Sequence, residues 1–307
     1  MTLDSTTPVD SASTSKVQSA YPSASGEAIS ACAASTRCIG IICGNSNYPL
    51  LVARACMEKN IRFCLLLLKD CVDLNEFEEL HVPFLKVNLG EISKALDFFH
   101  ENEVTEVIFA GGVKRPNFNN LSLDKKGASW MLKLGKAIFS GDDALLRKLS
   151  SLFEEEGFKI LAGTDLLDNV FVKNGVFSKR HPNESDYEDI EKGFEVAKAI
   201  GKMDIGQSVI ICDGIILGVE CVEGTDALID RCAQLRKSDH GGILVKVSKP
   251  QQDCRLDLPT IGIDTINRLN KNGFSGVAVE AGNCIVINKK SVIEQADDFS
   301  MFFCGYE

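Results

Sequence analysis

The stretch that decides the fold is CIGIICGNSNYP, residues 38–49. Six apolar or small residues form a run that ends before Gly44, and a polar turn leads to Pro49. A short apolar run bounded by turn residues is typical of a buried strand, and proline is well tolerated in the first turn of a helix. The stretch therefore predicts a strand followed directly by a helix that runs to about Lys59.

This alternation of strands and helices continues outward from residues 38–49. Apolar runs at 62–68 and 104–110 predict two more strands, and residues 91–101 have the spacing of an amphipathic helix. Strands that alternate with helices usually pair in parallel beneath a cover of helices. We therefore expect an α/β protein with an N-terminal Rossmann-like parallel-sheet domain, which would bind ligands outside the carboxyl ends of its strands.

The C-terminal half has a more mixed pattern. Asp213-Gly214 separates two apolar runs and predicts a hairpin, because Asp-Gly is favoured in two-residue turns. Runs at 277–280 and 284–287 predict a second, hairpin-like pair. We expect a mixed α/β domain in this half of the chain.

Two boundaries divide the chain. Residues 1–36 are rich in Ser, Thr and Ala and predict a disordered tail. Two helical stretches follow the first set of strands, and we place the domain boundary near Ser140-Gly141. The expected organisation is an N-terminal domain at 37–140 and a C-terminal α/β domain at 141–307.

The composition excludes several classes of protein. Lys and Arg total 33 and Asp and Glu total 43 among the 307 residues, and the resulting formal net charge of −10 disfavours nucleic-acid binding. No apolar run approaches the roughly 20 residues of a membrane-spanning helix. Several of the 12 cysteines lie inside apolar, strand-like runs, which favours buried reduced thiols over disulfides.

Two glycine-containing turns follow predicted strands and are candidate anion sites. The turn at 44–49 would expose backbone N–H groups at the start of a helix. Gly111-Gly112 precedes Lys114 and Arg115, so backbone amides and a guanidinium could cradle an anion together. A plain strand-to-helix turn and a solvated pair of charges remain the structural alternatives for these two motifs.

The richest candidate region lies between Glu220 and Asp257. Acidic residues stand at a predicted strand end and in the first turn of the next helix, where they could hold Mg²⁺, an ion that takes few protein ligands. The structural alternative makes Thr225 the helix N-cap, with Asp226 favoured by the helix dipole. The pool of candidate metal ligands is Glu220, Glu223, Asp226, Asp253 and Asp257, and the candidate cations are Lys114, Arg115, Lys246, Lys249 and Arg255.

These two sets of residues indicate one kind of chemistry. An acidic protein that binds a diphosphate needs local cations and a divalent metal, and metal-assisted attack of water on phosphorus uses both.

Several blocks of the chain resemble one known family in sequence and in order. The most specific are GVECVEGTDALI at 218–229 and KPQQDCRLDLPTIG at 249–262, joined by IGIICGNSNYPLLVARA at 39–55 and VIFAGGVKRPNF at 107–118. From about residue 37 to the C-terminus the chain resembles the LpxI family of UDP-2,3-diacylglucosamine pyrophosphatases. Its first turn and its AGGVKRP loop depart from the family's usual GGGxLP-like turn and AGKVRRP loop, so one cation is missing at Gly112.

The resemblance implies a fold, a reaction and a place in the cell. The family has an N-terminal Rossmann-like domain and a distinct C-terminal α/β catalytic domain, with the ligand between them. It uses Mg²⁺ to hydrolyse UDP-2,3-diacylglucosamine to UMP and 2,3-diacylglucosamine 1-phosphate. This reaction belongs to lipid A synthesis in Gram-negative bacteria. The resemblance also implies a cytoplasmic enzyme in peripheral contact with the inner membrane, and a homodimer.

The resemblance also implies a role for each candidate residue. The acid of the EGTDA block, Asp226, would be the catalytic carboxylate. The expected catalytic residues are Asp226, Glu223 and Lys249. The expected metal ligands are Asp226, Glu220, Asp253 and Asp257. The expected substrate-binding residues are Gly44, Asn45, Ser46, Gly111, Gly112, Lys114, Arg115, Thr225, Lys246, Gln252 and Arg255.

Two other classes of function stay open at this point. A non-catalytic nucleotide-sugar-binding module would keep the glycine turns without needing the acidic residues. A Rossmann-type oxidoreductase would also fit the parallel sheet, although the first turn lacks the GxGxxG pattern of dinucleotide-binding proteins.

Overall fold

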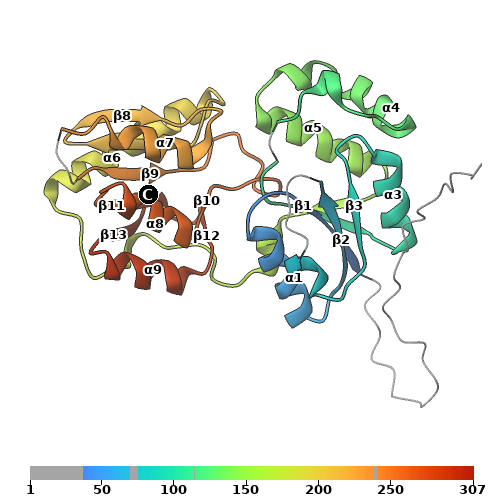
Figure 1. Ribbon diagram of the computed structural model, residues 1–307, viewed down its shortest axis with the longest axis horizontal. Coiled ribbons are helices and arrows are strands. Elements are labelled where there is room, and N and C mark those ends of the chain that lie inside the picture. The colour runs from blue at the N-terminus through green and yellow to red at the C-terminus, as the bar shows by residue number, and fades with distance from the viewer. Residues whose placement is uncertain (1–36, 70–74, 114, 238–240) are drawn as a thin grey trace, which may run out of the picture.

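The computed structural model of the protein describes residues 37–69, 75–113, 115–237 and 241–307. The tail expected at 1–36 and the candidate cation Lys114 lie outside these residues. The described chain forms two α/β halves that lie side by side, each built on its own sheet (Figure 1). No helix in the described ranges is both long and apolar enough to span a bilayer.

The N-terminal half is a parallel sheet with the strand order β3-β2-β1-β4-β5. This confirms the expected parallel sheet, and the order is that of doubly wound nucleotide-binding folds. Its strands are β1 (Cys38–Cys43), β2 (Arg62–Leu68), β3 (Phe84–Val87), β4 (Glu106–Ala110) and β5 (Lys159–Leu161). Its helices are α1 (Tyr48–Glu58), α2 (Asn75–Glu78), α3 (Ile92–Glu101), α4 (Lys125–Leu134) and α5 (Asp142–Glu155).

Helices cover both faces of this sheet because its strands are apolar on both sides. In β1, Ile41 packs on the face that α1 covers, and Ile42 packs on the face that α3, α4 and α5 cover. Successive side chains of a strand point to opposite faces, so a continuous apolar run such as β1 needs partners on both.

The division between the halves falls later than residue 140. Strand β5 pairs in parallel with β4, and Phe153 of α5 packs in the same core as Phe109 of β4. A boundary near Ser140-Gly141 would separate α5 and β5 from the sheet that they complete. An apolar strand pattern shows that a strand is buried, but it does not show which sheet the strand joins.

The C-terminal half is a mixed sheet with the strand order β6-β13-β11-β9-β7-β8, as expected for a mixed α/β domain. Its strands are β6 (Gly175–Val176), β7 (Ser208–Cys212), β8 (Ile215–Val219), β9 (Ile243–Lys246), β11 (Gly276–Glu280) and β13 (Phe302–Tyr306). Strands β10 (Thr260–Ile261) and β12 (Ile285–Val286) form a separate parallel pair. The helices are α6 (Glu184–Lys202), α7 (Gly224–Ala233), α8 (Ile263–Lys271) and α9 (Lys289–Asp298).

One of the two predicted hairpins is confirmed and the other is wrong. Strands β7 and β8 pair in antiparallel fashion around Asp213-Gly214, whose φ angles of 51° and 74° suit a tight hairpin turn. Strand β11 instead pairs in parallel with β9 and β13, whereas β12 pairs with β10. The two adjacent apolar runs therefore belong to different sheets.

A segment of the C-terminal half returns to the N-terminal half, and we name residues 249–260 the crossing segment (Figure 1). Leu256 packs in the core beneath α3, α4 and α5, and Leu258 packs in the core beneath α1. Asp257, between the two leucines, faces the space between the halves. The N-terminal core thus includes side chains that the chain supplies from beyond residue 250.

Candidate active site between the two halves

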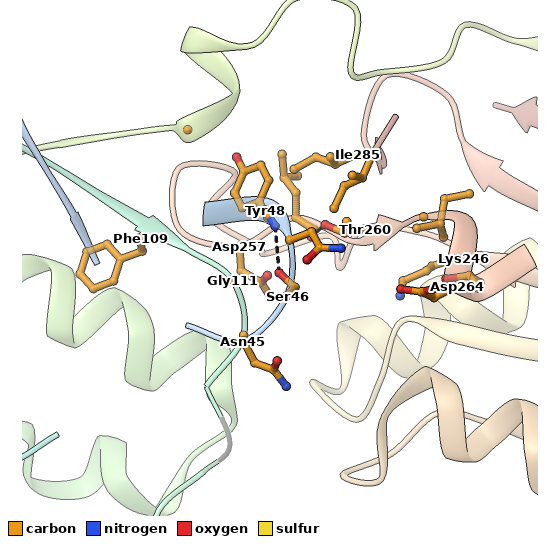
Figure 2. Close-up of a pocket in the computed structure, with 18 of the residues that line it drawn as sticks. Asn45, Ser46, Tyr48, Phe109, Gly111, Lys246, Asp257, Thr260, Asp264 and Ile285 are labelled. Carbon is orange, nitrogen blue, oxygen red and sulfur yellow. Dashed lines mark hydrogen bonds between the residues drawn. The ribbon is translucent and has the colours of Figure 1, made fainter. Parts of the chain in front are cut away.

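A cavity of about 620 Å³ lies between the two halves, and we name it the interdomain cavity. Figure 2 shows Asn45, Ser46 and Tyr48 on its N-terminal side, and Lys246 and Asp264 across from them. Its N-terminal wall lies at the carboxyl ends of β1 and β4, where open α/β sheets usually bind ligands.

The two glycine turns predicted as anion sites form one unit in this wall. The backbone N–H of Asn45 donates to the carbonyl of Gly112 (2.6 Å), and the N–H of Gly112 donates to the carbonyl of Asn45 (3.0 Å). A Cβ atom on Gly44 would lie 2.5 Å from the Gly112 carbonyl oxygen, so only glycine fits there. Gly111 has a φ of +82°, which also favours glycine.

The N-termini of three helices meet at the interdomain cavity. The N-cap residues of α1, α8 and α9 are Asn47, Gly262 and Asn288, and all three line the cavity. None of the three has a side-chain capping hydrogen bond within the described part of the chain. Helix N-termini carry free N–H groups and partial positive charge, so their convergence favours an anionic ligand such as a phosphate.

Lys246 supplies a formal positive charge to this cavity. Only 7% of this residue is exposed, and its Nζ donates to Thr225 Oγ1 (2.9 Å) at the start of α7. The Thr225 hydroxyl in turn donates to Glu220 Oε1 (2.7 Å), and Gln207 N donates to the other Glu220 oxygen (3.1 Å). A buried charge needs compensation, and this network holds the ammonium in place at the cavity wall.

Asp257 adds a negative group to the same cavity. The surrounding protein raises the pKa of its carboxyl, an effect that the nearby Lys249 and Lys246 oppose. Its side chain is nevertheless exposed to the cavity, and Gln252 Nε2 donates to its Oδ2 (3.0 Å).

Comparison with known proteins identifies the family. Residues 38–170 match the family model for the LpxI N-terminal domain, and residues 173–304 match the model for the LpxI C-terminal domain. The chain belongs to the LpxI family. UDP-2,3-diacylglucosamine pyrophosphatase LpxI of Caulobacter vibrioides is 36% identical to it over 279 residues, which are 88% of this chain and 98% of that protein.

The three expected catalytic residues of this LpxI-family chain lie outside the lining of the interdomain cavity. Asp226 is in the first turn of α7 with 66% of its side chain exposed, and it pairs with Arg268 (3.4 Å). Glu223 pairs with Arg231 (2.8 Å). Burial acts to raise the pKa of the Glu223 carboxyl, but hydrogen bonds from its own backbone and from Arg231 lower this pKa overall. Lys249 donates to Asp204 Oδ1 (2.6 Å).

Of these three, Asp226 is next to a residue that hydrogen-bonds to the cavity lining. Its neighbour Thr225 accepts a hydrogen bond from Lys246, which lines the cavity.

The four expected metal ligands do not form one cluster. Asp226 is exposed on α7, Glu220 is buried against Thr225, and Asp257 lies in the cavity. Asp253 pairs with Arg255 (2.8 Å), whose hydrogen bond lowers the pKa of this carboxyl. Within residues 37–69, 75–113, 115–237 and 241–307, no three His, Cys, Asp or Glu side chains are placed to hold a metal ion.

The structure sorts the expected binding residues into three groups. Those that line the interdomain cavity are Asn45, Ser46, Gly111, Gly112, Lys246 and Arg255. Gly44 and Thr225 support that wall through their contacts, and Gln252 orients Asp257. Arg115 instead binds Asp142 (2.9 Å) and two backbone carbonyls ahead of α5, which is a structural role.

Sequence reasoning missed several residues of the cavity. They are Tyr48, Gln207, Thr260, Asp264 and Asn288. A usable signal existed for Asp264, because it follows Gly262 at the start of α8. Asn288 carried no such signal, since its left-handed backbone (φ 55°) ahead of α9 is not visible in the sequence.

Proposed function

We propose that the protein hydrolyses the diphosphate bond of UDP-2,3-diacylglucosamine, giving UMP and 2,3-diacylglucosamine 1-phosphate for lipid A synthesis. The observation that carries the proposal is the convergence of three helix N-termini and Lys246 on one cavity. A diphosphate is the ligand that such a cavity favours. The name of the Caulobacter relative supplies the rest of the substrate.

In this proposal the chain's own residues bind the diphosphate and stabilise the charge that develops on it. Backbone N–H groups after Gly262 would donate to phosphate oxygens, and Lys246 would offset their negative charge. Fixed donors that face developing charge are a large source of rate enhancement, because they need no rearrangement during the reaction. Asp226 would orient the attacking water as the general base.

Mg²⁺ is part of the proposal, with Asp226 as its protein ligand. Mg²⁺ in phosphate sites usually has one or two carboxylate ligands and takes its other oxygens from water and substrate. The exposed Asp226 carboxylate fits that pattern, and the scattered carboxylates of the described chain do not form a cage. When bound, the ion would neutralise charge on the phosphate oxygens.

The test compares two carboxylates of α7 that both contact Arg268. Asp226→Asn is expected to lower Mg²⁺-dependent release of UMP by about 10³-fold, a typical effect of losing a general base or its metal. Asp230→Asn, which also removes a partner of Arg268 (2.5 Å), is the matched control and should keep most of the activity. The measurement is UMP release with Mg²⁺ or with EDTA.

Other outcomes of this test are equally informative. Equal losses in the two variants would mean that the Arg268 contacts matter and that Asp226 has no special role. If the folded wild-type protein binds UDP without turnover under any metal, the protein is a nucleotide-sugar-binding module.

We also propose that the protein contacts the inner membrane from the cytoplasmic side through α4 and the 3₁₀ turn that follows it at Gly135–Phe139. Leu132 and Phe139 are 83% and 90% exposed there, beside the exposed Lys133 and Lys136. Apolar side chains flanked by lysines favour binding to an anionic bilayer. Sedimentation with vesicles of phosphatidylglycerol should decrease for the double variant Leu132→Ser, Phe139→Ser.

We also propose that the protein forms a homodimer. Light scattering of the purified protein tests this proposal separately.

A further inference from the structure

Two carboxylates of α7 share one arginine of α8. Arg268 Nη1 donates to Asp230 Oδ2 (2.5 Å), and Arg268 Nη2 lies 3.4 Å from Asp226 Oδ2. A guanidinium carries its N–H groups in a planar fork, so one arginine can bind two carboxylates at once. Arg268 therefore joins the first turn of α7, which carries Asp226, to α8, whose N-cap Gly262 lines the interdomain cavity.

The two contacts of Arg268 are not equally strong. Asp230 also accepts a hydrogen bond from Asn272 Nδ2 (2.9 Å), and that amide donates to the backbone carbonyl of Arg268 as well (3.0 Å). Asp226 has Arg268 as its one ion-pair partner in the described part of the chain, and 66% of its side chain is exposed. Exposed ion pairs are weak, so the contact with Asp226 is the one that a competing cation can replace.

Arg268 lies one helical turn behind the interdomain cavity. Asp264, in the first turn of α8, lines the cavity, and Arg268 follows it by four residues, so the two lie on the same face of the helix. Figure 2 shows Asp264 on the same side of the cavity as Lys246. Lys246 hydrogen-bonds to Thr225, which precedes Asp226 in the chain. The guanidinium thus binds Asp226 close to the wall where the diphosphate would bind.

The guanidinium of Arg268 is a cation on the carboxylate that would bind Mg²⁺. Carboxylate oxygens are ligands that Mg²⁺ prefers, and an arginine beside a carboxylate satisfies the same negative charge. A divalent ion and a guanidinium on one carboxylate would bring two positive groups together, which Coulomb repulsion opposes. The two cations therefore compete for Asp226.

We propose that Arg268 is a positioning residue that holds the Asp226 carboxylate against α8 until a divalent cation displaces it. The guanidinium then stays bound to Asp230. The inference rests on the proposed function, in which Asp226 is the carboxylate ligand of Mg²⁺. Arg268 thereby raises the Mg²⁺ concentration at which the enzyme becomes active, because the ion has to replace an existing ion pair.

The direct test measures binding of Mn²⁺, a paramagnetic substitute for Mg²⁺, to the purified protein. Electron paramagnetic resonance reports the free Mn²⁺, so the readout needs neither substrate nor turnover. Arg268→Met should lower the Kd for Mn²⁺ by about fivefold, the upper end of the effect of losing an exposed competing ion pair. Arg268→Gln should change the Kd in the same direction, and circular dichroism shows which variants are folded.

Lys271 provides the matched control, because it is exposed on the same helix three residues after Arg268. Lys271→Met removes the same charge but no partner of Asp226, so it should change the Kd by less than about twofold, since salt screens charges at a distance. The Mg²⁺ concentration that gives half-maximal release of UMP should fall in Arg268→Met by the same factor as the Kd, and should stay unchanged in Lys271→Met.

The variant Asp226→Asn separates failure of this inference from failure of the proposed function. If Asp226→Asn loses Mn²⁺ binding but the folded Arg268 variants bind it as wild type does, the inference is overturned and the proposed metal ligand stands. Equal decreases of the Kd in Arg268→Met and Lys271→Met would also overturn the inference, because net charge would explain both. Mn²⁺ binding that is unchanged in Asp226→Asn would overturn the proposed metal ligand and the inference together.

Discussion

Two lysines three positions apart show how little a charge at a given position says about its role. Lys246 ends β9 and holds Thr225 at the wall of the interdomain cavity. Lys249 begins the crossing segment, and its ammonium is bound by Asp204 (2.6 Å). Both were candidates from the sequence, but only Lys246 lines the cavity that would bind the diphosphate.

Substitution by methionine separates these two roles. Lys246→Met should lower kcat/KM by about 10²-fold, because it removes the positive charge that faces the phosphates. Lys249→Met should lower the free energy of unfolding by about 2 kcal/mol, since it leaves the largely buried Asp204 without its partner. Steady-state kinetics and urea unfolding measure the two effects. A loss of activity in Lys249→Met at unchanged stability would return that lysine to the catalytic set.

Neighbouring glycines in the turn after β4 offer a second matched pair. Gly111→Ala should lower the free energy of unfolding by at least about 2 kcal/mol, because its φ is +82° and its Cβ would lie 2.5 Å from the Asn45 carbonyl oxygen. Gly112→Ala should stay within about 0.5 kcal/mol of wild type, because its Cβ meets open space. Equal effects of the two substitutions would contradict this account of the turn.

At the scale of elements, Glu91 anchors the start of α3. The backbone N–H of Asn88 and the Lys94 ammonium hydrogen-bond to its carboxylate and lower its pKa from 4.5 to about 2. A pKa that is lower in the folded state stabilises the fold above the unfolded value. This contribution should therefore be complete above about pH 5 and disappear as the pH falls from 4.5 toward 2.

The variant Glu91→Gln tests this pH dependence. Its stability should be lower than that of wild type at pH 7, and the two should converge near pH 2. The measurement is urea unfolding at several pH values. Parallel stability curves over the whole range would contradict the assignment.

Local elements were predictable because their signals are local. The β1–α1 unit follows from an apolar run, a polar turn and Pro49, and the β7–β8 hairpin follows from Asp213-Gly214. Pairing between strands is not local, so the place of β5 in the first sheet and the parallel pairing of β12 with β10 were missed. The same limit applies to the site, where glycine turns were found but the left-handed Asn288 was not.

At the scale of the whole molecule, the interdomain cavity combines residues some 240 positions apart, from Asn45 to Asn288. Spacing along the chain placed the candidate acids Asp253 and Asp257 near one another, in the block KPQQDCRLDLPTIG. In the folded protein, neighbouring residues of this block lie in different places. Leu256 and Leu258 enter the N-terminal cores, and Asp257 faces the cavity.

This arrangement predicts that a substitution late in the chain destabilises the N-terminal half. Leu256→Ala should lower the free energy of unfolding by about 2–4 kcal/mol, because it leaves a void in a core of the first sheet. The exposed Leu235 provides the control variant Leu235→Ala, with a change below about 0.5 kcal/mol. Hydrogen exchange should quicken in β1, β2 and β4. Faster exchange confined to the C-terminal strands would contradict the prediction.

The crossing segment also limits how members of this family can be recombined. A chimera joined near residue 172, between the regions matching the two family domains, would pair one member's N-terminal sheet with another member's Leu256 and Leu258. Both N-terminal cores of such a hybrid would contain a leucine side chain from the other family member. Exchange of the N-terminal half is therefore expected to succeed only when residues 249–260 are transplanted with it.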